Sequence, residues 1–185
     1  MNNNFQINFS LKGFTSILIG VYIFISGYLI KTILDGFLID DNSMTMLSIE
    51  ILEVLIILII ILVFLFSSFA LFFSGKRNAK KLQYKLWNKN TKAAFQKYSI
   101  GVIIIFTALF ILMNLGLINY LAPTFLFLYG ILLFIFKNKK RKNLLVLNGL
   151  SLLLSLMCFL IPSYWSSSLS ILGIAHIAYG FVVKE

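Results

Sequence analysis

The stretch VLIILIIILVFLFSSFALFF, Val54 to Phe73, has twenty residues and no charged side chain. At about 1.5 Å of rise per residue, a helix of this length covers the roughly 30 Å hydrocarbon core of a bilayer. Strands of a transmembrane barrel alternate apolar and polar residues, whereas this stretch is apolar on every side. Because a segment in lipid must satisfy its own backbone, the stretch predicts a transmembrane helix.

The whole composition agrees with this interpretation. The 185 residues are 60% apolar and only 12% charged, which is more apolar than a soluble domain needs. We therefore expect an all-α integral membrane protein that forms a single transmembrane domain over residues 1–185. The predicted crossings number six and cover about 13–34, 50–75, 98–117, 120–137, 143–161 and 164–183.

Basic residues predict the orientation of these crossings. Of the 16 Lys and Arg residues, eight lie in the connector 76–97 and five in 136–142, while Lys12 and Lys184 flank the same side. Only Lys31 falls on the opposite side. Since positive loops stay cytoplasmic, we expect both termini inside, in the inner (cytoplasmic) membrane.

The same charges indicate a partner class. The excess of basic residues that gives the formal net charge of +10 lies on the predicted cytoplasmic side. We therefore expect the basic loops to attract anionic lipid headgroups and not nucleic acid. In the basic connector 76–97, apolar residues recur at helical spacing, which predicts an extension of the second helix that is either a solvated connector or an interface-lying, partner-binding segment. Asn90 or Thr91 is the expected N-cap of the third helix.

The last four predicted helices form two hairpins that can be laid over each other. Gly101 is followed 29 residues later by Gly130, and Gly149 is followed 31 residues later by Gly180. Short connections predict antiparallel neighbours, so helices three and four, and five and six, are expected to form a weak internal repeat.

The second of these hairpins resembles a known family. Gly149, then Pro162 at the outer turn, then LGIAHIAYG with Gly173 and Gly180, is similar to the repeat of HdeD-like acid-resistance membrane proteins. The resemblance covers about 35 residues. It implies a six-helix bundle of two-helix repeats in the inner membrane and a role in stress tolerance, without a defined reaction.

His176 is the only histidine and lies within an apolar run, which makes it a candidate functional residue. One hypothesis is a hydrogen bond to a neighbouring helix; the other is a proton relay or pH sensor, which needs an acid or a water path nearby. The expected hydrogen-bond partners are Ser151, Ser155, Asn148 and Asn114.

The sequence gives little evidence for a catalytic site or a metal site. Gly149 and Ser151 resemble the nucleophile motif of rhomboid-type intramembrane proteases, but Leu153 occupies the position of a small residue, so we expect no catalytic site. One histidine and one cysteine, Cys158, do not make a metal or haem site, and no cofactor is expected.

Two further patterns have alternative interpretations. Glu50 and Glu53 share a face at the start of the second helix, where they either form a cation-attracting mouth with Asp35, Asp40 and Asp41 or complement the helix N-terminus. Small residues form stripes that serve either assembly of the bundle or dimerisation: Ser16, Gly20 and Gly27 on the first helix, and Gly173 and Gly180 on the last.

Two functions follow from these observations. The first is a non-enzymatic accessory, structural or stress-response membrane protein that acts by contact, as a homo-oligomer or with a membrane-protein partner. The second is a small transporter or substrate-capture component, which resembles vitamin-binding S-components in size and topology, with an outward pocket lined by Tyr164, Trp165, Ser166 and Ser168. A polar cavity around His176 favours the second function, and a sealed His176 favours the first.

Overall fold

The computed structural model describes residues 13–38, 49–81, 83, 87, 89–135 and 144–183. Within these ranges the chain forms α-helices, two short 3-10 helices and no strand, which confirms the all-helical fold. The elements are α1 (Gly13–Leu38), α2 (Ile49–Lys81), α3 (Lys89–Asn114), η2 (Ile118–Tyr120), α4 (Leu121–Ile135), α5 (Leu144–Leu160), η3 (Pro162–Tyr164) and α6 (Trp165–Val182).

Among the described residues, five segments are long and apolar enough to cross a membrane, which indicates a multi-pass membrane protein. They are Gly13–Gly36, Ile51–Lys80, Thr91–Asn114, Ile118–Ile135 and Pro162–Val182. The predicted helix 143–161 is present as α5, but its 17 residues span only about 26 Å. It is apolar and shorter than the other five.

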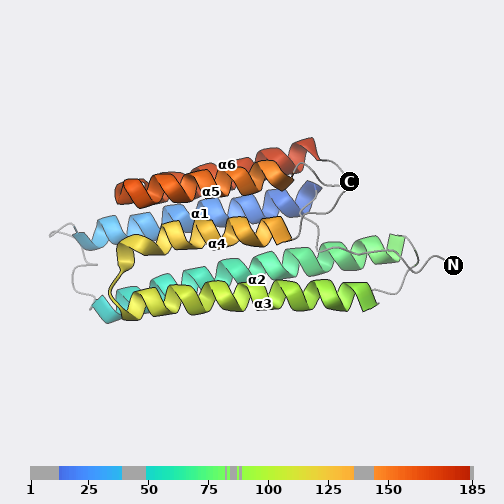
Figure 1. Ribbon diagram of the computed structural model, residues 1–185, viewed down its shortest axis with the longest axis horizontal. Helices are drawn as coiled ribbons and strands as arrows, with labels where there is room; N and C mark the ends of the chain where they lie inside the picture. The colour runs from blue at the N-terminus through green and yellow to red at the C-terminus, as the bar shows by residue number, and fades with distance from the viewer. Residues whose placement is uncertain are drawn as a thin grey trace.

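The helices lie side by side, with α1 and α4 between the α5–α6 pair and the α2–α3 pair (Figure 1). The most extensive contacts join α1 to α6 and α4 to α5, while α2 packs on α1 and α3 on α4. The predicted hairpins α3–α4 and α5–α6 are present, each with a three-residue 3-10 turn that ends in tyrosine. However, α4, α5 and α6 each make more extensive contacts with a helix outside their own hairpin than with their hairpin partner. Only α3 has its most extensive contacts within its hairpin.

The small-residue stripes of α1 and α6 face each other. A Cβ added at Gly20 would lie 2.5 Å from the carbonyl oxygen of Gly173, and one added at Gly180 would lie 2.6 Å from the carbonyl oxygen of Gly13. At the end of the pair, the backbone N–H of Gly13 donates to the carbonyl of Val183 at 3.0 Å. These stripes therefore serve assembly within one chain, the first of the two alternatives that the sequence left open.

The repeated glycines differ in their surroundings. Gly130 and Gly180 each pack against a helix outside their own hairpin, α5 and α1 respectively. Gly101 faces the Leu132 side chain of its own hairpin, whereas a Cβ at Gly149 would meet no atom within 4 Å. The two hairpins thus match at their turns and at their second glycine, but not at their first.

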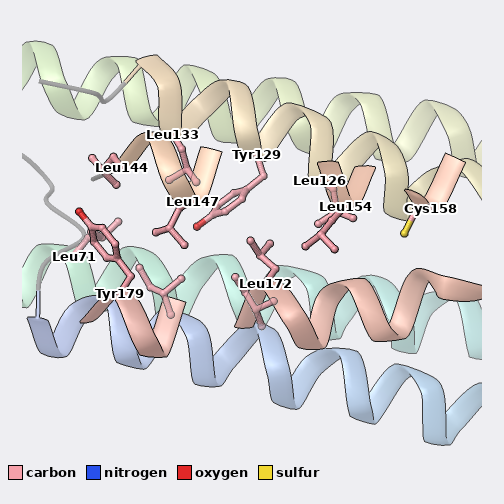
Figure 2. Packing of buried hydrophobic residues seen from close by; sticks show 12 residues of the cluster. Leu71, Leu126, Tyr129, Leu133, Leu144, Leu147, Leu154, Cys158, Leu172 and Tyr179 are labelled. Carbon is pink, nitrogen blue, oxygen red and sulfur yellow. The ribbon is translucent and has the colours of Figure 1, made fainter. Parts of the chain in front are cut away.

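A cluster of buried apolar side chains fills the space between α1, α4, α5 and α6, with Leu71 reaching it from α2. Figure 2 shows the Tyr129 ring pointing from α4 into this cluster, with Cys158 near one end and Leu71 and Tyr179 near the other. A smaller cluster joins α3 to α4 through Ile105, Leu109 and Leu132.

The basic connector 76–97 is mostly helical where it is described. As predicted, α2 continues past residue 75, and it ends at Lys81. The N-cap prediction at Asn90 or Thr91 is wrong, because α3 already begins at Lys89. The Thr91 side chain is only 2% exposed, so it packs within the first turn instead of preceding the helix.

Candidate functional site: the buried histidine

His176 lies in the second half of α6, and its side chain is fully buried. Its Nε2 lies 2.9 Å from the hydroxyl of Tyr129 on α4, and its Nδ1 lies 3.3 Å from Oγ of Ser16 on α1. The same Ser16 hydroxyl lies 2.9 Å from the backbone carbonyl of His176. One residue of α6 is therefore bonded to both α1 and α4.

The position of each proton follows from the chemistry of the partners. A carbonyl only accepts, so the single hydroxyl proton of Ser16 is donated to the His176 carbonyl. Ser16 Oγ then accepts from Nδ1–H, and Nε2, which is left without a proton, accepts from the Tyr129 hydroxyl. His176 is neutral in this arrangement, and both of its ring nitrogens have a partner.

This arrangement has the wrong polarity for serine catalysis. A nucleophilic serine gives its proton to the imidazole, whereas here the imidazole donates to the serine oxygen. All three side chains are buried, with exposed fractions of 0% for Ser16 and His176 and 8% for Tyr129. The geometry serves to hold three helices together.

The acidic residues that the structure describes lie at the other end of the bundle from His176. Of the acidic side chains that the structure describes, Asp35 and Glu53 are exposed, on the last turns of α1 and the first turns of α2. His176 lies near the opposite end of the bundle, six residues before the end of α6. Next to it, the Tyr129 ring stacks on Phe125 with centroids 5.7 Å apart.

A second set of polar contacts joins α4 to α5. Asn148 Nδ2 donates to the Gly130 carbonyl, and the hydroxyls of Ser151 and Ser155 donate to the carbonyls of Leu126 and Pro123, each at 2.7 Å. The three donors recur every three to four residues on one face of α5 and are all buried. Two of them, Asn148 and Ser151, were candidate functional residues, and the structure uses them in helix packing.

The predicted partners of His176 are therefore wrong. Asn148, Ser151 and Ser155 bind α4 carbonyls, and Asn114 is exposed at the end of α3. In the sequence, Ser16 was identified only as part of a small-residue stripe. Nothing in the sequence distinguished Tyr129 except its position beside Gly130. Neither could be assigned to His176, because residues 160 and 47 positions apart meet only through the α1–α6 and α4–α6 packing.

The acidic candidates are only partly described by the structure. Glu50 and Glu53 lie in the first turns of α2, and the Glu53 side chain is exposed. Asp40 and Asp41 lie outside the described residues. Across the described ranges, no group of three or more His, Cys, Asp or Glu residues is placed to hold a metal ion.

The outward residues proposed as a pocket lining also separate. Tyr164 is half exposed in η3. Ser168 is buried and hydrogen-bonded to the Cys158 thiol, so it joins α6 to α5. The Ser170 hydroxyl on the same helix donates to the Ser166 carbonyl, one turn earlier. Trp165 is half-buried and packs against the buried apolar cluster, whereas Tyr164 is exposed.

Comparison of the chain with protein-family models, with curated proteins and with solved structures gave no match. The resemblance of the last hairpin to HdeD-like proteins stays a prediction.

Proposed function

We propose that the protein is a non-enzymatic, multi-pass protein of the inner membrane that acts as a structural or accessory subunit. The observation that carries this proposal is the closed set of hydrogen bonds at His176, which leaves neither ring nitrogen available to a ligand. The proposal includes six crossings, with α5 as the sixth beside the five longer apolar segments, and the stress-tolerance role that the HdeD-like resemblance implies.

The rest of the bundle interior supports the same function. In a substrate-capture protein, buried polar groups of the binding site pair with polar groups of the ligand. They need this pairing because a polar group left without a hydrogen bond in an apolar site costs free energy. Here the polar side chains on α5, Asn148, Ser151 and Ser155, bind the α4 backbone instead. Interhelical bonds of this kind stabilise membrane proteins by about 0.6 kcal/mol each.

The charge distribution supports the predicted orientation. The exposed cations Lys76, Arg77 and Lys80 lie near the end of α2, and Lys92 and Lys97 near the start of α3. This is the end at which α1 begins and α6 ends (Figure 1). By the positive-inside rule, this end is cytoplasmic.

Native mass spectrometry of the protein in a mild detergent tests the function. We expect a bare or lipid-only chain, or a complex with a second protein chain, and the same result for His176→Ala. A small metabolite that remains bound to the wild-type protein and is lost in His176→Ala would contradict the proposal and favour the substrate-capture function. Tyr28→Phe is the matched control, since Tyr28 is 64% exposed on α1.

A further inference from the structure

The α2–α3 pair extends beyond the other helices at the end where α1 begins and α6 ends (Figure 1). α2 has 33 residues and is about 50 Å long, whereas the hydrocarbon core is roughly 30 Å thick. The apolar stretch 54–73 already covers that thickness. Residues 74–81 of α2 therefore lie beyond the hydrocarbon.

Three aromatic rings mark the level at which α2 leaves the hydrocarbon. The Trp87 ring lies 6.5 Å from Phe72 of α2 and 5.8 Å from Phe95 of α3, measured between centroids. α2 continues for nine residues past Phe72. Because the Trp87 ring lies beside Phe72, it is well short of the end of α2 and closer to the hydrocarbon. Trp87 is 48% exposed, and tryptophan at this position is typical of the headgroup level of a membrane protein.

Exposed cations lie just above these rings. Lys76 and Lys80 follow Phe73 by three and seven residues, which places them about 5 and 10 Å along the helix axis. Arg77 lies between them. On α3, Lys92 precedes Phe95 by three residues and lies on the same side of the rings, whereas Lys97 follows Phe95 by two residues and lies about 3 Å on the hydrocarbon side, from which its long side chain can reach the headgroups. The headgroup layer is about 5 to 8 Å thick on each side of the bilayer, so the backbones of Lys76 and Arg77 lie within it and that of Lys80 lies just beyond its outer boundary.

Among the described residues, no acidic residue lies near the positive charge at this end. In the part of the chain that the structure describes, the acidic residues Asp35, Glu50 and Glu53 all lie at the opposite end. An uncompensated group of cations attracts anions, and each Lys or Arg near an anionic membrane surface contributes to binding. Arg77 can in addition bind a phosphate through two parallel hydrogen bonds.

We propose that this basic end of α2 and α3 (Lys76, Arg77, Lys80, Lys92 and Lys97, with Trp87) binds the headgroups of anionic phospholipids. The partner is a lipid because the cations lie in the headgroup layer or next to it, and the aromatic rings lie at its inner boundary. The inference requires that the helices are embedded in a membrane, as in the proposed function. It does not require that the protein lacks enzymatic activity or that this end is cytoplasmic.

The test measures lipid retention on the full chain in detergent. The protein is incubated with equal amounts of phosphatidylglycerol and phosphatidylcholine at low salt, and the bound lipids are counted by native mass spectrometry. We expect a several-fold preference for phosphatidylglycerol. The affinity for phosphatidylglycerol should fall at least tenfold in the combined variant Lys76→Gln, Arg77→Gln and Lys80→Gln, since each cation contributes about fivefold, and the preference should disappear.

Two controls keep the result interpretable. Lys31→Gln removes an exposed cation from the opposite end and should leave the preference unchanged. If the triple variant loses helicity by circular dichroism, Lys92→Gln with Lys97→Gln tests the same surface from α3. Equal retention of both lipids, or a preference that survives neutralisation of both helices, would overturn the inference and leave the proposed function untouched.

Discussion

Ser16 Oγ lies 3.3 Å from Nδ1 of His176 and 2.9 Å from the backbone carbonyl of the same residue. One hydroxyl of α1 thus accepts from the ring and donates to the backbone of a single residue on α6. Together with the bond from Tyr129 on α4, this places the only histidine at the junction of three helices. The role that follows for His176 is helix packing.

Tyr129→Phe tests the donor to the ring. The substitution leaves Nε2 of His176 buried without a partner, which should lower the stability by about 1 to 2 kcal/mol. Thermal unfolding in a mild detergent measures the change. Tyr28→Phe, on the exposed surface of α1, should have no measurable effect, and equal effects of the two variants would contradict the predicted role of Tyr129.

Gly173→Ala tests the close approach of α1 and α6. The new Cβ would lie 2.8 Å from the Gly20 carbonyl oxygen and 2.9 Å from Cβ of Phe24, so the helices must separate. We expect a loss of about 1 to 3 kcal/mol.

Gly149→Ala is the matched control for that substitution. A Cβ at Gly149 meets no atom within 4 Å, and alanine is the better helix former, so this variant should unfold at the same or a slightly higher temperature. If Gly173→Ala is tolerated as well as Gly149→Ala, α1 and α6 do not pack as described.

Ser151→Ala tests the polar contacts between α4 and α5. Its hydroxyl donates across the interface to Leu126, and its loss should cost about 0.6 kcal/mol. Ser170→Ala removes a hydroxyl that bonds only to its own helix, at Ser166, and should cost less. The difference between the two unfolding midpoints measures the interhelical contribution.

The orientation can be tested by labelling intact cells with a membrane-impermeant maleimide. The native Cys158 is buried and serves as the unreactive background. Leu117→Cys, in the exposed turn after α3, should be labelled from outside, whereas Lys80→Cys should be labelled only after the membrane is opened. The reverse pattern would show that the basic end faces outwards.

The sequence by itself determined the helical class and the approximate ends of the helices. Twenty consecutive apolar residues, such as 54–73, allow only a structure that satisfies its own backbone in lipid, and this constraint is local. The segregation of cations such as Lys80 from acids such as Glu53 is also readable along the chain. A boundary prediction failed at Asn90 and Thr91, because α3 begins at Lys89, before either residue, and Thr91 is buried in its first turn.

Only the tertiary structure decided which residues His176 contacts and whether the glycine stripes act within one chain. Apolar helices fit together in many registers of similar hydrophobicity, so periodicity cannot choose between Ser151 and Ser16 as a partner. The choice is made by close approach: Gly20 and Gly173 bring the backbones of α1 and α6 together, and this places Ser16 beside His176. Such a contact depends on residues 160 positions apart, which no local pattern relates.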